Sequence, residues 1–220
     1  MTPDAFYTDA HRKLQTAFGR EALADAVFHS IVEDHINEAN AGFIESRDFF
    51  FVSTVAASGI PTVSYKGGAP GVVQVLDPKT LVFPNYDGNG MFRSMGNAAE
   101  TGKIGLLFMD FETPNRVRIE GQVTLGADPD DLARFPGANL VARVAVASCF
   151  LNCARYIHKH ERIAASPYVP DDKGQQPHPS WKRIDAVQPT LTDEERQRTA
   201  EAGGPITPDD YVEKLMKGVS

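Results

Sequence analysis

Two kinds of hydrophobic pattern divide the chain. Over residues 9–40, apolar residues such as Leu23 and Val27 recur four positions apart, which predicts helices, and Gly19 is expected to separate a short first helix from a longer second one. The pattern then changes to short runs that are rich in Phe, Val and Thr or that alternate between apolar and polar residues, as strands do. These runs lie at 48–57, 61–65, 72–76, 80–83, 104–108, 116–125 and 140–150.

Helix signals interrupt the predicted strands and return near the end of the chain. Residues 91–102 predict a helix that ends at Gly102. Thr192, followed three residues later by Glu195, has the pattern of a capping box, which predicts a last helix over 192–202. Short strands joined by short loops, with one helix between them, favour a small antiparallel barrel.

Composition and charge narrow the classes of function. The 220 residues carry a formal net charge of −7, which gives no indication of a nucleic-acid or anionic-membrane partner. The two cysteines, Cys149 and Cys153, are not spaced as metal ligands or as a redox pair, and no metal site is expected. The polar start of the sequence lacks a secretory signal and no apolar run is long enough to span a bilayer, so we expect a cytoplasmic protein.

Polar residues gather at three predicted strand ends, at 64–66, 85–93 and 115–116. If these strands are neighbours in one barrel, the three clusters lie close together. The residues suited to a phosphate group, by charge or by a donated hydrogen bond, are Ser64, Lys66, Asn89 and Arg93. Those suited to a planar ring or its polar edge are Phe83, Pro84, Tyr86, Asn115 and Arg116. The set fits a phosphorylated planar cofactor, although each residue taken alone is more often an ordinary turn or strand residue.

Three longer segments, taken in order, resemble one known family. They are FFFVSTVAASGIPTVSYKGGAPG, LVFPNYDGNGMFRSMGNAAETGKIGLLF and PNRVRIEGQV, within roughly residues 47–157. Their order and spacing are similar to those of the pyridoxamine 5′-phosphate oxidase-like, FMN-binding split-barrel family. The most specific part is the run from Pro114 to Gly121.

The resemblance implies an α+β fold with a six-stranded antiparallel split β-barrel, a homodimer, and FMN in two clefts at the subunit interface. It implies cofactor contacts at Ser64, Tyr65, Lys66, Phe83, Pro84, Asn85 and Asn89, and at Arg116, whose side chain would hydrogen-bond the flavin ring. Asn152 and Arg155 are the candidates for the contribution of the partner subunit. The chain departs from the oxidases at Gly90-Met91, where they carry adjacent basic residues, so FMN binding carries over better than the pyridoxamine phosphate substrate.

The predicted function is that of an FMN-dependent oxidoreductase, which transfers hydride through flavin N5 to or from an unidentified small molecule. The alternatives are a deazaflavin-dependent reductase on the same barrel and a non-catalytic protein that binds flavin or haem. We expect helices packed on the barrel at 1–46, the barrel itself at 47–157, and an extended arm with a short helix at 158–220. The arm either crosses the dimer or is held on its own subunit by Trp181, and both arrangements fit the sequence.

Overall fold

The computed structural model describes residues 1–218, and its internal contacts divide the chain into two units. The first unit comprises Met1–Ala165 together with Asp172–Gly174, and the second comprises Ser166–Asp171 and the chain from Gln175 onward. The first unit therefore contains the whole of the predicted barrel and the first part of the predicted arm. No helix within the described range is long and apolar enough to cross a membrane.

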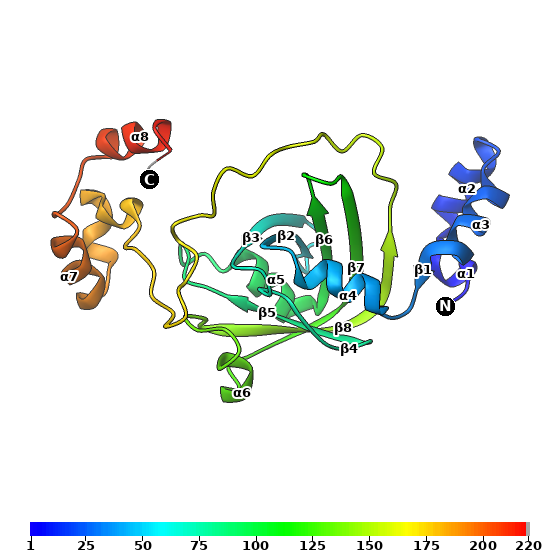
Figure 1. Ribbon diagram of the computed structural model, residues 1–220, viewed down its shortest axis with the longest axis horizontal. Helices are drawn as coiled ribbons and strands as arrows, with labels where there is room; N and C mark the ends of the chain where they lie inside the picture. The colour runs from blue at the N-terminus through cyan, green and yellow to red at the C-terminus, as the bar shows by residue number, and fades with distance from the viewer. Residues whose placement is uncertain (219–220) are drawn as a thin grey trace. The chain divides into compact units, whose positions relative to one another are not determined.

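An antiparallel sheet of eight strands forms the first unit (Figure 1). The sheet follows the order β3-β2-β6-β7-β8-β5-β4, with β1 beside β8, and it does not close on itself. This confirms the predicted α+β split barrel, and the sheet has eight strands where the resemblance implies six. The strand that none of the predicted runs anticipates is the two-residue β1. The strands are β1 (Val32–Glu33), β2 (Phe49–Val55), β3 (Pro61–Gly67), β4 (Gln74–Asp77), β5 (Thr80–Asn85), β6 (Lys103–Asp110), β7 (Asn115–Gly126) and β8 (Leu140–Leu151).

The longest strands, β7 and β8, have twelve residues each and follow the predicted alternation. Val117, Ile119 and Val123 of β7 are buried, as the alternation predicts for the face that meets the core. The register between the two strands shifts between Glu120 and Gly121, because β8 carries one extra residue, Ala147, as a bulge opposite this point. A Cβ atom at Gly121 would lie 2.3 Å from the backbone oxygen of Ala145, so the bulge requires glycine.

Phenylalanine rings fill the middle of the core. Phe50, Phe83 and Phe108 come from β2, β5 and β6 and are completely buried. The Phe50 ring lies 5.2 Å from that of Phe83 and 5.5 Å from that of Phe108, measured between ring centroids. Burial of each such side chain contributes about 1.5–3 kcal/mol, so this cluster is a major source of the stability of the barrel.

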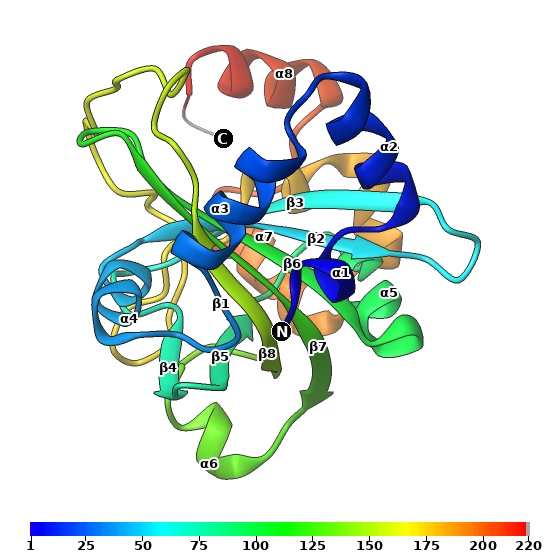
Figure 2. The same ribbon diagram turned by 90° about the vertical axis from the view of Figure 1, so that its right-hand side faces the viewer.

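Two helices pack on the barrel at separate places, as Figure 2 shows. The helix α4 (Glu38–Glu45) lies beside β4, and α5 (Arg93–Thr101) packs on β2, β3 and β7. The chain leaves α5 through Gly102, whose φ of +65° is the left-handed conformation that the sequence predicts for this position. The remaining helices of the first unit are α1 (Pro3–Phe6), α2 (Asp9–Ala17), α3 (Glu21–Ile31) and α6 (Pro129–Leu132).

The second unit is helical and consists of η1 (Ser180–Arg183), η2 (Asp185–Thr190), α7 (Asp193–Glu201) and α8 (Pro208–Met216). The capping box that the sequence predicts at Thr192 and Glu195 is present at the start of α7. Lys182 is 5% exposed, and its Nζ lies 2.8 Å from Oε1 of Glu195, so the ion pair fastens η1 to α7. The sequence analysis missed α8, although Thr207 begins this helix with a second capping box.

Candidate functional site

The strand β3 carries three of the predicted cofactor residues on its two faces. Ser64 and Lys66 lie opposite Val52 and Phe50, which are completely buried, so both point to the side of the core. Tyr65 lies between them on the outer face of the sheet and is 62% exposed. Ser64 and Lys66 can therefore contribute to one site, whereas Tyr65 belongs to another surface.

Lys66 is a half-buried cation with a weak neutral partner. Its Nζ donates a long hydrogen bond of 3.5 Å to Oδ1 of Asn85. Nδ2 of Asn85 donates to Oδ1 of Asn139 at 2.9 Å and to the backbone oxygen of Tyr86 at 3.2 Å, which fixes the amide. Burial lowers the pKa of Lys66, because the charged form loses solvation that the amide does not replace. An anion beside Nζ would stabilise the charged form of Lys66 and raise its pKa again.

The N-terminus of α5 lies next to Ser64. The preceding residue, Phe92, has a φ of +48°, and no side chain caps the helix. Ser94 in its first turn is buried, and its Oγ forms a hydrogen bond of 2.6 Å with Oγ of Ser64. Arg93 is the first residue of the helix and is exposed, and the first turn contains no acidic residue. Free N–H groups, two hydroxyls and a cation together favour an anion at this position.

A polar cluster holds α5 against the strands. Nδ2 of Asn97 donates to Oγ1 of Thr54 at 3.4 Å and to Oγ1 of Thr62 at 3.3 Å, and the two threonine hydroxyls lie 3.0 Å apart. At the end of the helix, Oγ1 of Thr101 donates to the backbone oxygen of Val55 at 3.0 Å. These bonds fix the position of the helix N-terminus relative to β3.

A second polar pair lies at the other predicted location, where β7 begins and β8 ends. Val117 pairs with Leu151, so the next residues along the two strands are Arg116 and Asn152. Arg116 lies on the outer face of the sheet, because its neighbour Val117 is completely buried in the core. Nε of Arg116 and Oδ1 of Asn152 are buried atoms without a hydrogen-bond partner in the described part of the chain. A buried donor and a buried acceptor without hydrogen-bond partners are rare in proteins. A ligand edge that carries an acceptor beside a donor would satisfy both atoms.

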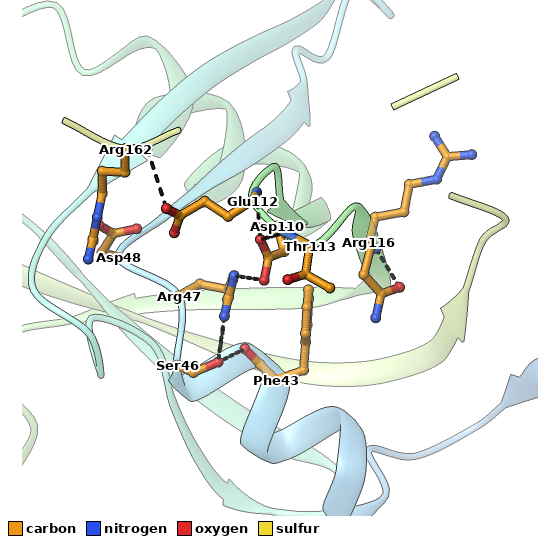
Figure 3. Close-up of polar contacts among 10 residues, drawn as sticks. Phe43, Ser46, Arg47, Asp48, Asp110, Glu112, Thr113, Arg116 and Arg162 are labelled. Atoms are coloured by element: carbon orange, nitrogen blue, oxygen red, sulfur yellow. Dashed lines mark hydrogen bonds and ion pairs between the residues drawn. The ribbon is translucent and has the colours of Figure 1, made fainter. Parts of the chain in front are cut away.

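The turn before Arg116 is held by a separate set of contacts, which Figure 3 shows. Oδ1 of Asp110 accepts hydrogen bonds of 2.9 Å from the backbone N–H groups of Glu112 and Thr113. Oδ2 of Asp110 lies 2.7 Å from the guanidinium of Arg47. The side chain of Arg116 extends away from this cluster in Figure 3, so its guanidinium is not used to build the turn.

Four other predicted residues lie in different surroundings. The Phe83 side chain is completely buried in the core, so its ring is not available to stack on a ligand. The side chain of Asn115 is turned to its own strand, where Oδ1 accepts from the backbone N–H of Arg116 at 2.8 Å. Pro84 is buried beside Phe83 in β5, and Arg155 is exposed with its guanidinium 5.3 Å from the ring centre of Tyr156.

Asn89 lies in the loop that connects β5 to α5. Its Oδ1 accepts from the backbone N–H of Met91 at 3.1 Å, which shapes the turn that leads into α5. The structure thus brings together Ser64, Lys66 and Asn85 near the start of α5, and separately Arg116 and Asn152.

Sequence reasoning missed Ser94 and Asn139, which bond directly to predicted residues. Ser94 follows Arg93 in the first helical turn, so the preference of small hydroxyl residues for helix starts was a usable signal. Asn139 is 54 residues from Asn85, and no local pattern links the two. Only the pairing of β5 with β8, in which Asn85 lies opposite Leu140, brings them together.

The family model described as pyridoxamine 5′-phosphate oxidase matches residues 36–169, which is more than half of the chain. The chain belongs to the pyridoxamine 5′-phosphate oxidase family. The match covers every strand from β2 to β8 and the beginning of the arm, and it includes both of the polar clusters described above. A search of curated proteins found no match.

Solved structures with a similar fold are also found. A putative pyridoxamine 5′-phosphate oxidase from Lactobacillus delbrueckii has 22% identity and a TM-score of 0.44, and the match covers 54% of this chain and 95% of that one. An FMN-binding protein from Syntrophomonas wolfei has 14% identity and a TM-score of 0.41, over 64% and 97% of the two chains. HutZ, the haem storage protein from Vibrio cholerae, has 13% identity and a TM-score of 0.40, over 53% and 94%.

Proposed function

We propose that this protein is an FMN-dependent oxidoreductase that works as a homodimer. Membership of the family supports a flavin as the cofactor. The two polar clusters of this chain offer groups that would complement the phosphate and the ring edge of FMN. The observation that carries the proposal is the pair of unpartnered buried atoms at Arg116 and Asn152.

The ring edge of a flavin offers the complement of that pair. The pyrimidine side of isoalloxazine presents a carbonyl oxygen next to a ring N–H. Nε–H of Arg116 would donate to the oxygen, and Oδ1 of Asn152 would accept from the N–H, which would satisfy both atoms at once. The edge of a haem carries propionates, which accept hydrogen bonds, and no ring N–H donor, so the Asn152 acceptor favours flavin.

The phosphate end of FMN fits the cluster at the start of α5. Lys66 lacks an anionic partner among the contacts described, its pKa is lowered by burial, and the hydroxyls of Ser64 and Ser94 lie at the uncapped helix end. Arg93 adds a second cation at the surface. Phosphate oxygens accept strong hydrogen bonds from such groups, so these four residues are the proposed phosphate contacts.

The outer face of the sheet supports assembly into a dimer. Val63 is 71% exposed and Tyr65 62% exposed on β3, and Phe51 and Leu107 lie on the same face in the neighbouring strands. Apolar and aromatic side chains gathered on one sheet face are typical of a surface that another protein covers. A second copy of the chain is the proposed partner, and Arg116 lies at the border of this face.

FMN, when bound, would supply the capacity for hydride transfer, and the residues of this chain would bind and orient it. Arg116 and Asn152 would orient the ring by its pyrimidine edge, and a cation at that edge stabilises negative charge on the ring. Lys66, Arg93 and the two serines would hold the phosphate. None of these steps requires a nucleophilic side chain.

The absorption spectrum of the purified protein tests the proposal. Bound FMN gives a yellow protein with the two bands of an oxidised flavin, and mass spectrometry of the released cofactor identifies it. Bleaching by NADH or NADPH under anaerobic conditions, with recovery on addition of an acceptor, would support the oxidoreductase activity. A protein that takes up deazaflavin or haem in preference to FMN when all three are offered would refute the proposed cofactor.

A further inference from the structure

The turn from Phe111 to Pro114 joins β6 to β7 and leads directly into Asn115 and Arg116. On one side it is fixed by Asp110, whose carboxylate binds two backbone N–H groups of the turn and the guanidinium of Arg47. The Arg47 guanidinium also lies 4.8 Å from the centre of the Phe43 ring on α4. The side chains of Arg47 and Asp110 are 21% and 18% exposed, so this ion pair is well shielded and ties the turn to α4.

The arm of the same chain fixes the other side of the turn (Figure 3). The backbone N–H of His160 donates to the backbone oxygen of Phe111 at 2.9 Å, and the two rings stack with their centroids 4.9 Å apart. The backbone N–H of Arg162 donates to Oε1 of Glu112 at 3.4 Å. The guanidinium of Arg162 forms an ion pair with Asp48, the residue immediately before β2. We call residues 160–162 the clasp.

The clasp also ends a stack of four aromatic rings that runs across the sheet edge. Phe49 stacks on Tyr65 at 5.5 Å and on Phe111 at 5.8 Å, with interplanar angles of 11° and 5°. His160 stacks on Phe111 at an angle of 25°. Phe111 therefore stacks both on a ring of the barrel and on a ring of the arm, and its position depends on both.

We propose that His160 and Arg162 are positioning residues that set the place of Arg116 by holding the turn before it. Neither residue lies in the proposed cofactor contacts, and both act on the turn through Phe111, Glu112 and Asp48. The part of the inference that concerns the cofactor rests on the proposed function. The part that concerns the turn does not, and it is tested without any ligand.

Hydrogen exchange of the ligand-free protein, read by mass spectrometry, tests the hold on the turn. In the double variant His160→Ala/Arg162→Ala, amides between residues 111 and 116 should exchange roughly 3- to 30-fold faster, since a ring stack and an exposed ion pair are lost. The control is Lys159→Ala, which removes an exposed positive charge from the same arm and should leave the exchange unchanged. Unchanged exchange at 111–116 in the double variant would overturn the proposal.

The affinity for FMN tests whether the hold acts through Arg116. The double variant should bind FMN about 3- to 30-fold more weakly, and in an Arg116→Ala background the same two changes should weaken binding less than about twofold. Equal losses in both backgrounds would show that the clasp acts elsewhere and would overturn this role. If no variant, including the parent, binds FMN, the proposed function fails, whereas faster exchange at 111–116 would still support the clasp.

Discussion

Replacement of Lys66 by Met is expected to weaken FMN binding without destabilising the ligand-free protein. Lys66 is half-buried, its Nζ has a long bond to the neutral amide of Asn85, and burial lowers its pKa. In the ligand-free protein the charge is therefore poorly compensated, and a Met side chain of similar length removes this cost. With FMN bound, the same charge would gain a phosphate oxygen. The two measurements should thus change in opposite directions, as is common at binding sites.

The loss in affinity follows from a single charged hydrogen bond. Such a bond contributes about 1.5–3 kcal/mol, which corresponds to a roughly 10- to 150-fold increase in Kd. Riboflavin lacks the phosphate, so its affinity should change by less than about threefold. The thermal midpoint of the ligand-free protein should stay the same or rise.

Fluorescence titration with FMN and with riboflavin measures these affinities, and calorimetry measures the midpoint. The matched control is Lys13→Met, which removes an exposed lysine on α2 and should leave both affinities unchanged. Equal losses for FMN and riboflavin would refute a phosphate contact. A large fall in the thermal midpoint of the ligand-free protein would refute the reasoning about the poorly compensated charge.

The pH dependence provides a further check on the same residue. Because the pKa of Lys66 is lowered in the free protein and a bound phosphate would raise it, binding takes up a proton between the two values. The FMN affinity should be highest below the lowered pKa of Lys66 and should fall as the pH rises through it. The Lys66→Met protein should lack this fall.

Three other predictions follow from the structure. Arg93→Ala should weaken FMN about 10- to 100-fold by titration, with little change for riboflavin, because one charged phosphate contact is lost. The parent protein should be a dimer by light scattering and Val63→Asp should be a monomer, since a carboxylate would be buried in the apolar interface; a parent monomer that still binds FMN would contradict the assembly. Burial lowers the pKa of His178 below 6.5, and the bond to Lys182 lowers that of Glu195 from 4.5 to about 2. The stability of the second unit, followed by hydrogen exchange, should therefore decrease as the pH falls below 6.5 and again from 4.5 to 2, and His178→Gln should remove the first step.

Much of the barrel could be predicted because its signals are local. Alternation identified the buried side of β7, and glycine at the end of α5 identified the left-handed residue that closes the helix. The capping box at Thr192 identified the start of α7 in the same way. These features depend on neighbours in sequence, which a single chain displays directly.

The predicted and observed strands differ where contacts beyond the strand's own residues determine the backbone conformation. The strand β1 has only two residues, Val32 and Glu33, and exists because it pairs with Phe150 and Cys149 of β8. The strand β4 begins at Gln74, two residues after the predicted start, because Val72 still belongs to the preceding turn, where its backbone N–H donates to the backbone oxygen of Ala69 at 2.9 Å. The position of β1 cannot be read from propensity, since its partner is distant in sequence.

In the candidate site, too, some features follow from local sequence and others depend on tertiary packing. That Ser64 and Lys66 share a face of β3 follows from the two-residue period of a strand, and the resemblance had already singled out both. The resemblance also nominated Phe83, whose ring the core instead buries between strands. A position carried over from a family specifies a backbone location, whereas the direction of its side chain depends on the packing of this chain.

The register between β7 and β8 changes the interpretation of Asn152, which directly precedes the arm. The sequence left open whether the arm crosses the dimer, and it assigned Asn152 to the cofactor of the partner subunit. In the structure the clasp binds the barrel of its own chain, and farther on Gly174 packs directly on Gly137, where an added Cβ atom would lie 2.4 Å from the Gly137 nitrogen. The clasp and Gly174, which both belong to the first unit, therefore contact the barrel of their own chain. Because Asn152 directly follows the residue opposite Val117, its side chain belongs with Arg116 of the same chain, and we propose that the two bind one flavin edge together. Any contribution of the partner subunit to that flavin edge would then come from residues other than its Asn152.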